Sequence, residues 1–288
     1  MLGMMYESPT NLQDVCLDYV CDNVDVLCEE QSEPNSTVTS LVFKDDVYLP
    51  NNISEQLLTT LCEKNKLNDK TITLFSSKVT NLKRVKITNA QLSLQSLRVL
   101  KGHRIIDLQV TGLEKVSVTD LLACLNDWTL THLRYLNVAN NTFVSGSKFC
   151  ILVSLARLKR LQGLNVCNTE FNETGLDVLA QNLACLEVLD ISGTPITDIS
   201  NLQKFKGQLK SLTMFNVHYG YNEASIKTLL SLQELKHLDI SHDFAIQPPV
   251  PHEFVRTNVE RLLERLKCNI NLTSLDVSGK EIQESSLV

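Results

Sequence analysis

The side chains with the greatest capacity for chemistry in this sequence are its nine cysteines and six histidines. A thiolate acts as a nucleophile or metal ligand, and an imidazole as a general base or metal ligand. However, the cysteines form no C-x-x-C pair, and the sequence contains no G-x-x-x-x-G-K-S/T, H-E-x-x-H or G-x-S-x-G motif. We therefore expect no metal, no cofactor and no enzymatic activity. A cysteine nucleophile stays open as an alternative, because its partners need only be adjacent in space.

The number and placement of the cysteines favour an intracellular protein. Their number is odd, and several occupy apolar positions, where a cysteine behaves as a small buried hydrophobe in a reducing compartment. The first six residues have no basic start and no cleavage site, so they do not resemble a secretion signal. No apolar run approaches the roughly 18 residues that cross a membrane. We expect a cytoplasmic protein, with the nucleus as an alternative.

Charge and composition exclude a nucleic-acid partner. The first fifty residues hold ten acidic side chains and one lysine, whereas the remainder is close to neutral. Nucleic-acid binding needs clustered basic residues and stacking aromatics, and aromatics make up only 6% of the chain. A hydrophobic content of 43% is typical of a globular protein with a substantial core.

An apolar pattern recurs through most of the chain and is clearest in residues 186–196, Leu-Glu-Val-Leu-Asp-Ile-Ser-Gly-Thr-Pro-Ile. It follows the template L-x-x-L-x-L-x-x-N/T-x-hydrophobic of leucine-rich repeats, in which a short strand points its apolar residues inward. Copies begin at Leu82, Ile105, Leu133, Leu161, Leu186, Leu209, Leu235 and Leu272. The intervals are 23 to 28 residues, except for a last one of 37 that contains Pro248-Pro249-Val250-Pro251 and predicts a surface insertion.

The segments between these strands have helical patterns, at 119–125, 173–183, 223–232 and 253–266. The fold class is therefore α/β, a leucine-rich-repeat solenoid in which short parallel strands alternate with outer helices and bend into an arc. The fifth position of each copy should face the concave side, as Lys86, Gln109, Asn137, Asn165, Asp190, Thr213, Asp239 and Asp276. An acidic ridge of three aspartates in this row is the alternative; we interpret the row as solvated surface and not as a metal site.

Two helices with apolar faces precede the array. The first is expected to start with Ser8 as N-cap and Pro9 as its first residue, and to end near Cys28. One face carries Leu12, Val15, Cys16, Tyr19, Val20 and Leu27, and the opposite, solvent-facing side carries Asp14, Asp18, Asp22 and Asp25. A polar loop over 29–37 and a short strand over 38–43 should follow.

The second helix should begin at Pro50 and bury Ile53, Leu57, Leu58 and Leu61. We expect residues 1–75 to form a helical region that caps the open end of the array, and residues 76–288 to form the array itself. After the last copy, residues 279–288 are too few for a second cap. The last layer should then be exposed, either because the chain is a fragment or short form, or because a further domain covers it.

Both N-terminal segments carry a recognisable motif. Leu12-x-x-x-Cys16-x-x-x-Val20 resembles the elongin-binding box, a helix whose leucine and cysteine enter an apolar groove of elongin C. Leu49-Pro50-x-x-Ile53-x-x-x-Leu57 resembles the cullin box that selects cullin-two. These two boxes in order, followed by repeats with Leu-Asp-Ile-Ser at 189–192 and 238–241, resemble the Zyg-eleven and Zer-one family of substrate receptors.

The resemblance implies a non-catalytic substrate receptor of a cullin-two RING ubiquitin ligase. By this resemblance Leu12, Cys16 and Val20 bind elongin C of the elongin B/C pair, and Leu49, Pro50, Ile53 and Leu57 bind cullin-two. Family members continue into armadillo-like repeats that bind protein substrates with an N-terminal glycine, a part that this sequence lacks. Asn11 departs from the small, hydroxyl or proline residue usual before the box leucine. The alternative is a stand-alone leucine-rich recognition module whose N-terminal helices only cap the array and therefore bury Leu12 and Cys16.

Overall fold

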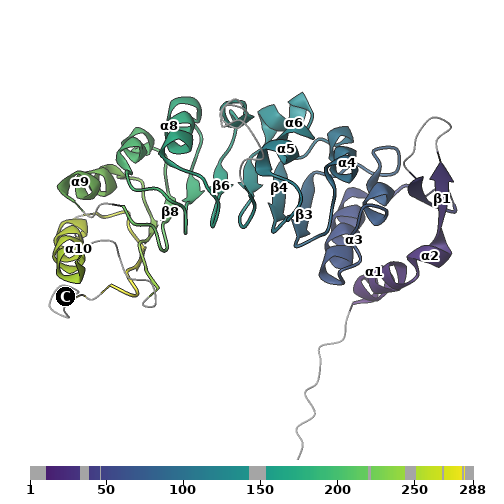
Figure 1. Cartoon of the computed structure of the whole chain (residues 1–288), viewed down its shortest axis with the longest axis horizontal. Helices are drawn as coiled ribbons and strands as arrows, with labels where there is room; N and C mark the ends of the chain where they lie inside the picture. Colours follow the sequence, from purple (N-terminus) through teal and green to yellow (C-terminus); the bar gives the residue numbers. More distant parts are fainter. Residues whose placement is uncertain are drawn as a thin grey trace, which may run out of the picture.

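The computed structural model describes residues 11–32, 39–45, 47–142, 154–219, 222–243, 251–267, 269–280 and 282. The chain forms an arc in which one sheet lines the inner side and helices lie on the outer side (Figure 1). The eight parallel strands are β3 (Arg84–Thr88), β4 (Asp107–Thr111), β5 (Tyr135–Asn137), β6 (Gly163–Asn165), β7 (Val188–Asp190), β8 (Ser211–Thr213), β9 (His237–Asp239) and β10 (Ser274–Asp276). Each strand begins two residues after a predicted repeat start, which confirms the solenoid and its eight copies.

The outer elements are the helices α4 (Leu94–Leu97), η2 (Arg98–Gly102), α5 (Val118–Ala123), α6 (Asp127–His132), α8 (Glu173–Asn182), η3 (Ser200–Phe205), α9 (Glu223–Ser231) and α10 (His252–Leu266). Asn126, Asn172 and Asn222 begin α6, α8 and α9, because each side chain accepts a hydrogen bond from a backbone N–H of the first turn. The expected insertion at 248–250 lies outside the described residues. Within the described residues, no helix is long and apolar enough to cross a membrane.

The chain leaves each strand through a turn that needs a left-handed residue. The eighth template position has a positive φ in seven copies, at Asn89, Gly112, Asn140, Asn168, Gly193, Asn216 and Gly279. Asparagine and glycine are the residues that adopt this conformation most readily. A Cβ on Gly193 would also lie 2.1 Å from Oδ1 of Asn168. Stacking of successive turns therefore selects the residue type at this position.

The acidic residues of the concave row stabilise these turns. The carboxylates of Asp190, Asp239 and Asp276 each accept a hydrogen bond from the backbone N–H two residues further on, at 3.0, 2.8 and 2.8 Å. Hydrogen bonds from the side chain and backbone of Ser278 lower the pKa of Asp276. Among the described residues, no group of three or more His, Cys, Asp or Glu residues is placed to hold a metal ion. The row is therefore part of the repeat architecture.

The N-terminal region differs in part from expectation. It comprises α1 (Leu12–Asp22), α2 (Val24–Leu27), the antiparallel strands β1 (Cys28–Ser32) and β2 (Thr39–Phe43), α3 (Asn51–Glu63) and η1 (Thr71–Phe75). The single helix predicted to reach Cys28 is wrong, because the chain turns at Asn23. The loop predicted over 29–37 is wrong at its start, where a polar segment of low strand propensity forms β1 by pairing with β2.

Helix α3 covers the edge of the sheet that is formed by β3. One carboxylate oxygen of Glu55 accepts hydrogen bonds from the backbone N–H groups of Lys83 (3.1 Å) and Arg84 (2.9 Å). At the other end of β3, the sulfur of Cys62 accepts a hydrogen bond from the backbone N–H of Thr88 at 3.1 Å. These contacts occupy backbone donors that an edge strand otherwise offers to another chain.

His103 joins the first two repeats from inside the core. Its ring is fully buried, Nδ1 accepts the backbone N–H of Leu82 (3.1 Å), and Nε2 donates to the carbonyl of Phe75 (2.7 Å). Burial lowers the pKa of His103 below its ordinary value of 6.5. The unfolded chain therefore binds a proton near this pH while the folded chain does not. The stabilisation that the neutral His103 side chain provides is therefore fully present above the ordinary histidine pKa, and it decreases as the pH falls below that value.

We expect the free energy of unfolding to decrease by about 1 kcal/mol between about pH 7.5 and about pH 5.5 through His103. Glutamine at this position preserves one donor and one acceptor but does not titrate, so His103→Gln should have a weaker pH dependence. Urea unfolding followed by the fluorescence of Trp128, the single tryptophan, measures both quantities. An unchanged pH dependence in His103→Gln would show that other groups control it.

Candidate docking site for a partner protein

Helix α1 has an exposed apolar face and a separate buried face. Leu12, Val15 and Tyr19 have exposed fractions of 79%, 49% and 59%. Cys16 is also exposed, and Val20 is half-buried. Leu17 and Cys21 form the buried face toward the rest of the protein. Of the first predicted box, Leu12 and Cys16 are thus open to solvent, whereas Val20 also packs against the core.

The N-terminus of α1 shows how Asn11 fits this motif. The side-chain oxygen of Asn11 accepts a hydrogen bond from the N–H of Asp14 at 2.9 Å, so Asn11 is the N-cap. Asparagine and serine are among the strongest N-cap residues. Asn11 therefore performs the capping function of a hydroxyl residue before Leu12. The predicted helix start at Ser8 and Pro9 lies outside the described residues, and the N-cap is Asn11 instead.

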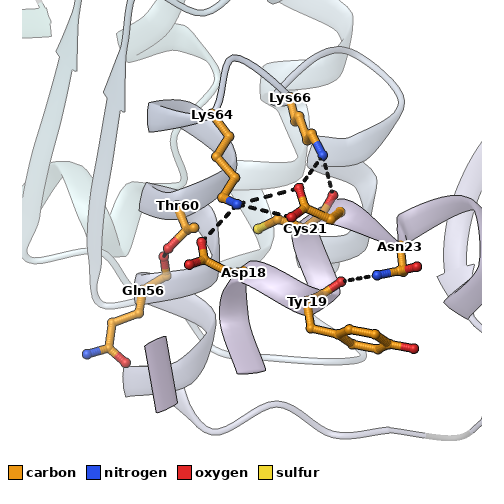
Figure 2. Close-up of polar contacts among 9 residues, drawn as sticks. Asp18, Tyr19, Cys21, Asn23, Gln56, Thr60, Lys64 and Lys66 are labelled. Carbon is orange, nitrogen blue, oxygen red and sulfur yellow. Dashed lines mark hydrogen bonds and ion pairs between the residues drawn. The ribbon is translucent and has the colours of Figure 1, made fainter. Parts of the chain in front are cut away.

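A network of charges fixes α1 to the C-terminal end of α3 (Figure 2). Nζ of Lys64 lies 2.9 Å from Asp18 Oδ1 and 3.3 Å from Asp22 Oδ2. Nζ of Lys66 lies 2.6 Å from Asp22 Oδ1 and donates to the carbonyl of Cys21 at 3.2 Å. Hydrogen bonds from Lys66 and Lys64 lower the pKa of Asp22.

This network corrects the expectation that Asp18 and Asp22 only face solvent. Their side chains are about half exposed, so each ion pair contributes little by itself. Two cations at the C-terminal end of α1 also interact favourably with the helix dipole. Together with the buried Leu17 and Cys21, the network determines which side of α1 faces outward.

The residues of the second box occupy the start of α3 with different exposures. Pro50 is the exposed N-cap, and Leu49 and Ile53 are half-buried against the core. Leu57 is only 2% exposed, and it belongs to the core. A direct contact between Leu57 and a partner is therefore not available in this conformation. Leu49, Pro50 and Ile53 remain the candidates for a contact with a partner.

The start of α3 is held in place by buried hydroxyl groups. The backbone N–H of Leu49 donates to the carbonyl of Val79 at 2.9 Å. The hydroxyl of Ser54 is fully buried. It donates a hydrogen bond to the carbonyl of Pro50 at 3.1 Å and also forms a hydrogen bond with the hydroxyl of Thr80. Val47 and Tyr48, which sequence reasoning missed, are 40% and 62% exposed just before this box. Their apolar character beside the box is the signal that points to them.

A cleft of about 450 Å³ lies between the N-terminal helices and the concave face. Asp14 and Leu17 line it from α1, Gln56 from α3, and Lys86 and Gln109 from the first two strands. Its walls carry amides and charges of both signs. The cleft thus lies on the side of α1 that carries Leu17, opposite the exposed face that carries Leu12 and Cys16.

Four of the described cysteines have raised thiol pKa values. Burial raises the pKa of Cys21 to about 11 and also raises the pKa of Cys28, Cys124 and Cys167. A protonated thiol is a poor nucleophile. These four cysteines are therefore suited to packing.

Comparisons with known proteins agree with the repeat architecture. A family model described as "Zer-1-like, Leucine-rich repeats" matches residues 195–287. The chain is 24% identical, over 98% of its length, to Protein zer-1 homolog of Homo sapiens and to the protein of the same name of Pongo abelii. For the Mus musculus protein of that name the identity is 23%. The chain spans about two fifths of the length of these curated relatives, 38% to 39%.

A solved structure shares this fold at low sequence identity. The crystal structure of the Rad7 and Elc1 complex in yeast contains a chain with a TM-score of 0.57 and 16% identity. The match covers 94% of this protein and 75% of that chain. The similarity therefore includes the N-terminal region as well as the repeats.

Proposed function

We propose that this chain, which is similar to Zer-1-like leucine-rich-repeat proteins, is a non-catalytic substrate-receptor component of a cullin-two RING ubiquitin ligase. In this proposal α1 places Leu12, Cys16 and Val20 in the groove of elongin C. Leu49, Pro50 and Ile53 contribute to the contact with cullin-two. The receptor accelerates ubiquitin transfer through proximity, because it holds a substrate near the ubiquitin-charged enzyme and raises its effective concentration.

The observation that supports this proposal most strongly is the exposure of Leu12 and Cys16 on a helix whose other face is buried. Leaving a leucine in water forgoes about 1.5–3 kcal/mol of burial. Exposed apolar patches of this kind are typical of partner-binding sites. A stand-alone module with capping helices would bury these two side chains, so their exposure counts against that alternative.

The relatives support the same proposal. Curated proteins that match this chain over nearly its whole length include Zer-1 homologues. The yeast structure of similar fold is a complex of Rad7 with Elc1, so a chain of this fold is known to bind a second protein. The described cysteines are free thiols, in keeping with the cytoplasm or nucleus as the place of action.

The cullin contact is tested with Pro50→Glu, which places a charge at an exposed position of the second box without changing the core. We expect this variant to bind elongin B/C like the wild type. Its complex with elongin B/C should bind the N-terminal domain of cullin-two about tenfold or more weakly, because the contact then buries an unpaired charge. Calorimetric titration of each preformed complex with this domain measures the difference.

Glu253→Gln on α10, at the far end of the chain, is the matched control for a change of charge, and it should leave cullin binding unaltered. Equal cullin affinity for wild type and Pro50→Glu would show that the second box does not contact cullin-two. The elongin assignment would remain to be judged on its own binding data.

A further inference from the structure

The last strand of the sheet leaves its core row uncovered. The fourth template position is no more than 2% exposed in each of the seven preceding strands, at Val85, Leu108, Leu136, Leu164, Leu189, Leu212 and Leu238. The equivalent Leu275 of β10 is 36% exposed, and Leu272 and Val277 beside it are half-buried. Of the elements that the structure describes, β10 is the last, and none of them covers this edge.

The backbone at this edge has a defined pattern of hydrogen-bonding groups. The N–H of Ser274 donates to the carbonyl of Lys236 (3.0 Å), and the carbonyl of Asp276 accepts from Ile240 (2.9 Å). Both residues therefore direct their backbone groups toward β9. Because successive residues of a strand alternate, the N–H and C=O groups of Leu275 point away from the sheet.

The opposite edge cannot provide a partner for β10. Strand β3 is covered by α3, where Glu55 and Cys62 occupy its backbone N–H groups. Head-to-tail addition of copies is therefore blocked. Pairing between two identical β10 edges, by contrast, closes after one contact and gives a dimer.

We propose that β10 pairs antiparallel with β10 of a second copy of this chain, about a two-fold axis at Leu275. In this register the two Leu275 residues exchange both of their backbone hydrogen bonds. Their side chains meet on the core side and cover each other. On the concave side, Ser274 of one copy lies opposite Asp276 of the other, so a hydroxyl faces each carboxylate and like charges do not face directly. The edge is self-complementary.

The dimer would place the two N-terminal regions far apart. In Figure 1, α1 lies at one end of the arc and the C-terminal repeats lie at the other. A dimer joined through β10 would thus present two α1 faces at its outer ends. If the proposed function holds, the assembly is a bivalent receptor, but the pairing itself does not depend on elongin or cullin binding.

Analytical ultracentrifugation of the purified 288-residue chain, from about 1 to about 300 μM, tests this pairing. Because a three-residue edge is smaller than a standard protein interface, we expect a reversible dimer with a Kd on the order of 100 μM. Ser274→Lys, opposite Asp276 of the second copy, should tighten the dimer about fivefold at low salt, and Ser274→Asp should weaken it by a similar factor. Both changes lie on the concave surface and leave the core unchanged.

Ser211 is the matched control, because it occupies the same repeat position in the inner strand β8. Ser211→Lys and Ser211→Asp should leave the association constant unchanged. A monomeric mass at all concentrations for both wild type and Ser274→Lys overturns the proposal. A dimer that responds equally to the Ser274 and Ser211 variants, or to neither, also overturns it, because association then uses another surface.

Discussion

Alanine at both Leu12 and Cys16 is expected to weaken binding of elongin B/C by about a hundredfold or more. Buried apolar anchors at the centre of an interface contribute about 2 kcal/mol or more each, and a helix bound in a groove concentrates its affinity in such anchors. Because both side chains are exposed in the free protein, the free energy of unfolding should change by less than about 0.5 kcal/mol. The variant therefore separates binding from folding.

Titration calorimetry with purified elongin B/C measures the affinity, and urea unfolding measures the stability of each variant. Phe254→Ala removes an apolar side chain of 43% exposure on α10; it should leave elongin binding unchanged and lower the free energy of unfolding by about 1 kcal/mol or less. Leu17→Ala, on the buried face of α1, should instead lower the free energy of unfolding by about 2–4 kcal/mol. Undiminished elongin binding by the folded Leu12→Ala/Cys16→Ala variant would refute the assignment of the first box.

Leu189→Ala should lower the free energy of unfolding by about 3–5 kcal/mol, whereas Leu275→Ala should lower it by about 1 kcal/mol or less. The two leucines occupy the same repeat position, but Leu189 is completely buried and Leu275 is 36% exposed. Truncation of Leu189 leaves a cavity between two packed layers. Since each repeat contacts only its neighbours, this cavity also weakens the coupling between the two halves of the array.

Urea unfolding at low micromolar protein concentration, followed by circular dichroism and Trp128 fluorescence, measures this contrast. The concentration should be low so that association through β10 does not contribute. Leu212→Ala, completely buried in the next strand, serves as a second inner-layer variant and should match Leu189→Ala. Equal losses for Leu189→Ala and Leu275→Ala would mean that the last layer is covered as well as the inner ones.

Much of the repeat array is predictable because its determinants are local and recur. The apolar residues at the first, fourth and sixth template positions located every strand, and the intervening segments located the helices α8, α9 and α10 to within about two residues. The acidic positions are also explained locally, since Asp190 bonds to a backbone group only two residues away.

The orientation of α1 was not predictable in the same way. Periodicity indicates which residues share a helix face, but not which face a distant element covers. Helix α1 carries apolar residues on two sides, and the longer stripe through Leu12 and Cys16 is the exposed one. Leu17 and Cys21 are buried because α3 packs on their side, and the partners Lys64 and Lys66 lie more than forty residues away in the sequence.

The hairpin and the second box show the same limitation. Strand β1 contains Glu29 and Glu30 and has little intrinsic strand propensity, so only its pairing with β2 reveals it. Leu57 fits the box pattern, yet the tertiary packing of α3 assigns it to the core. In both cases a contact between distant segments overrides the local signal.

The most direct test of the proposed receptor function is co-elution of the wild-type chain with purified elongin B/C in size-exclusion chromatography with light scattering. We predict a stable complex with one copy each of this chain, elongin B and elongin C at low micromolar concentration. A correctly folded chain that elutes separately from elongin B/C across this range would contradict the account. In that case the exposed face of α1 would have to serve a different partner.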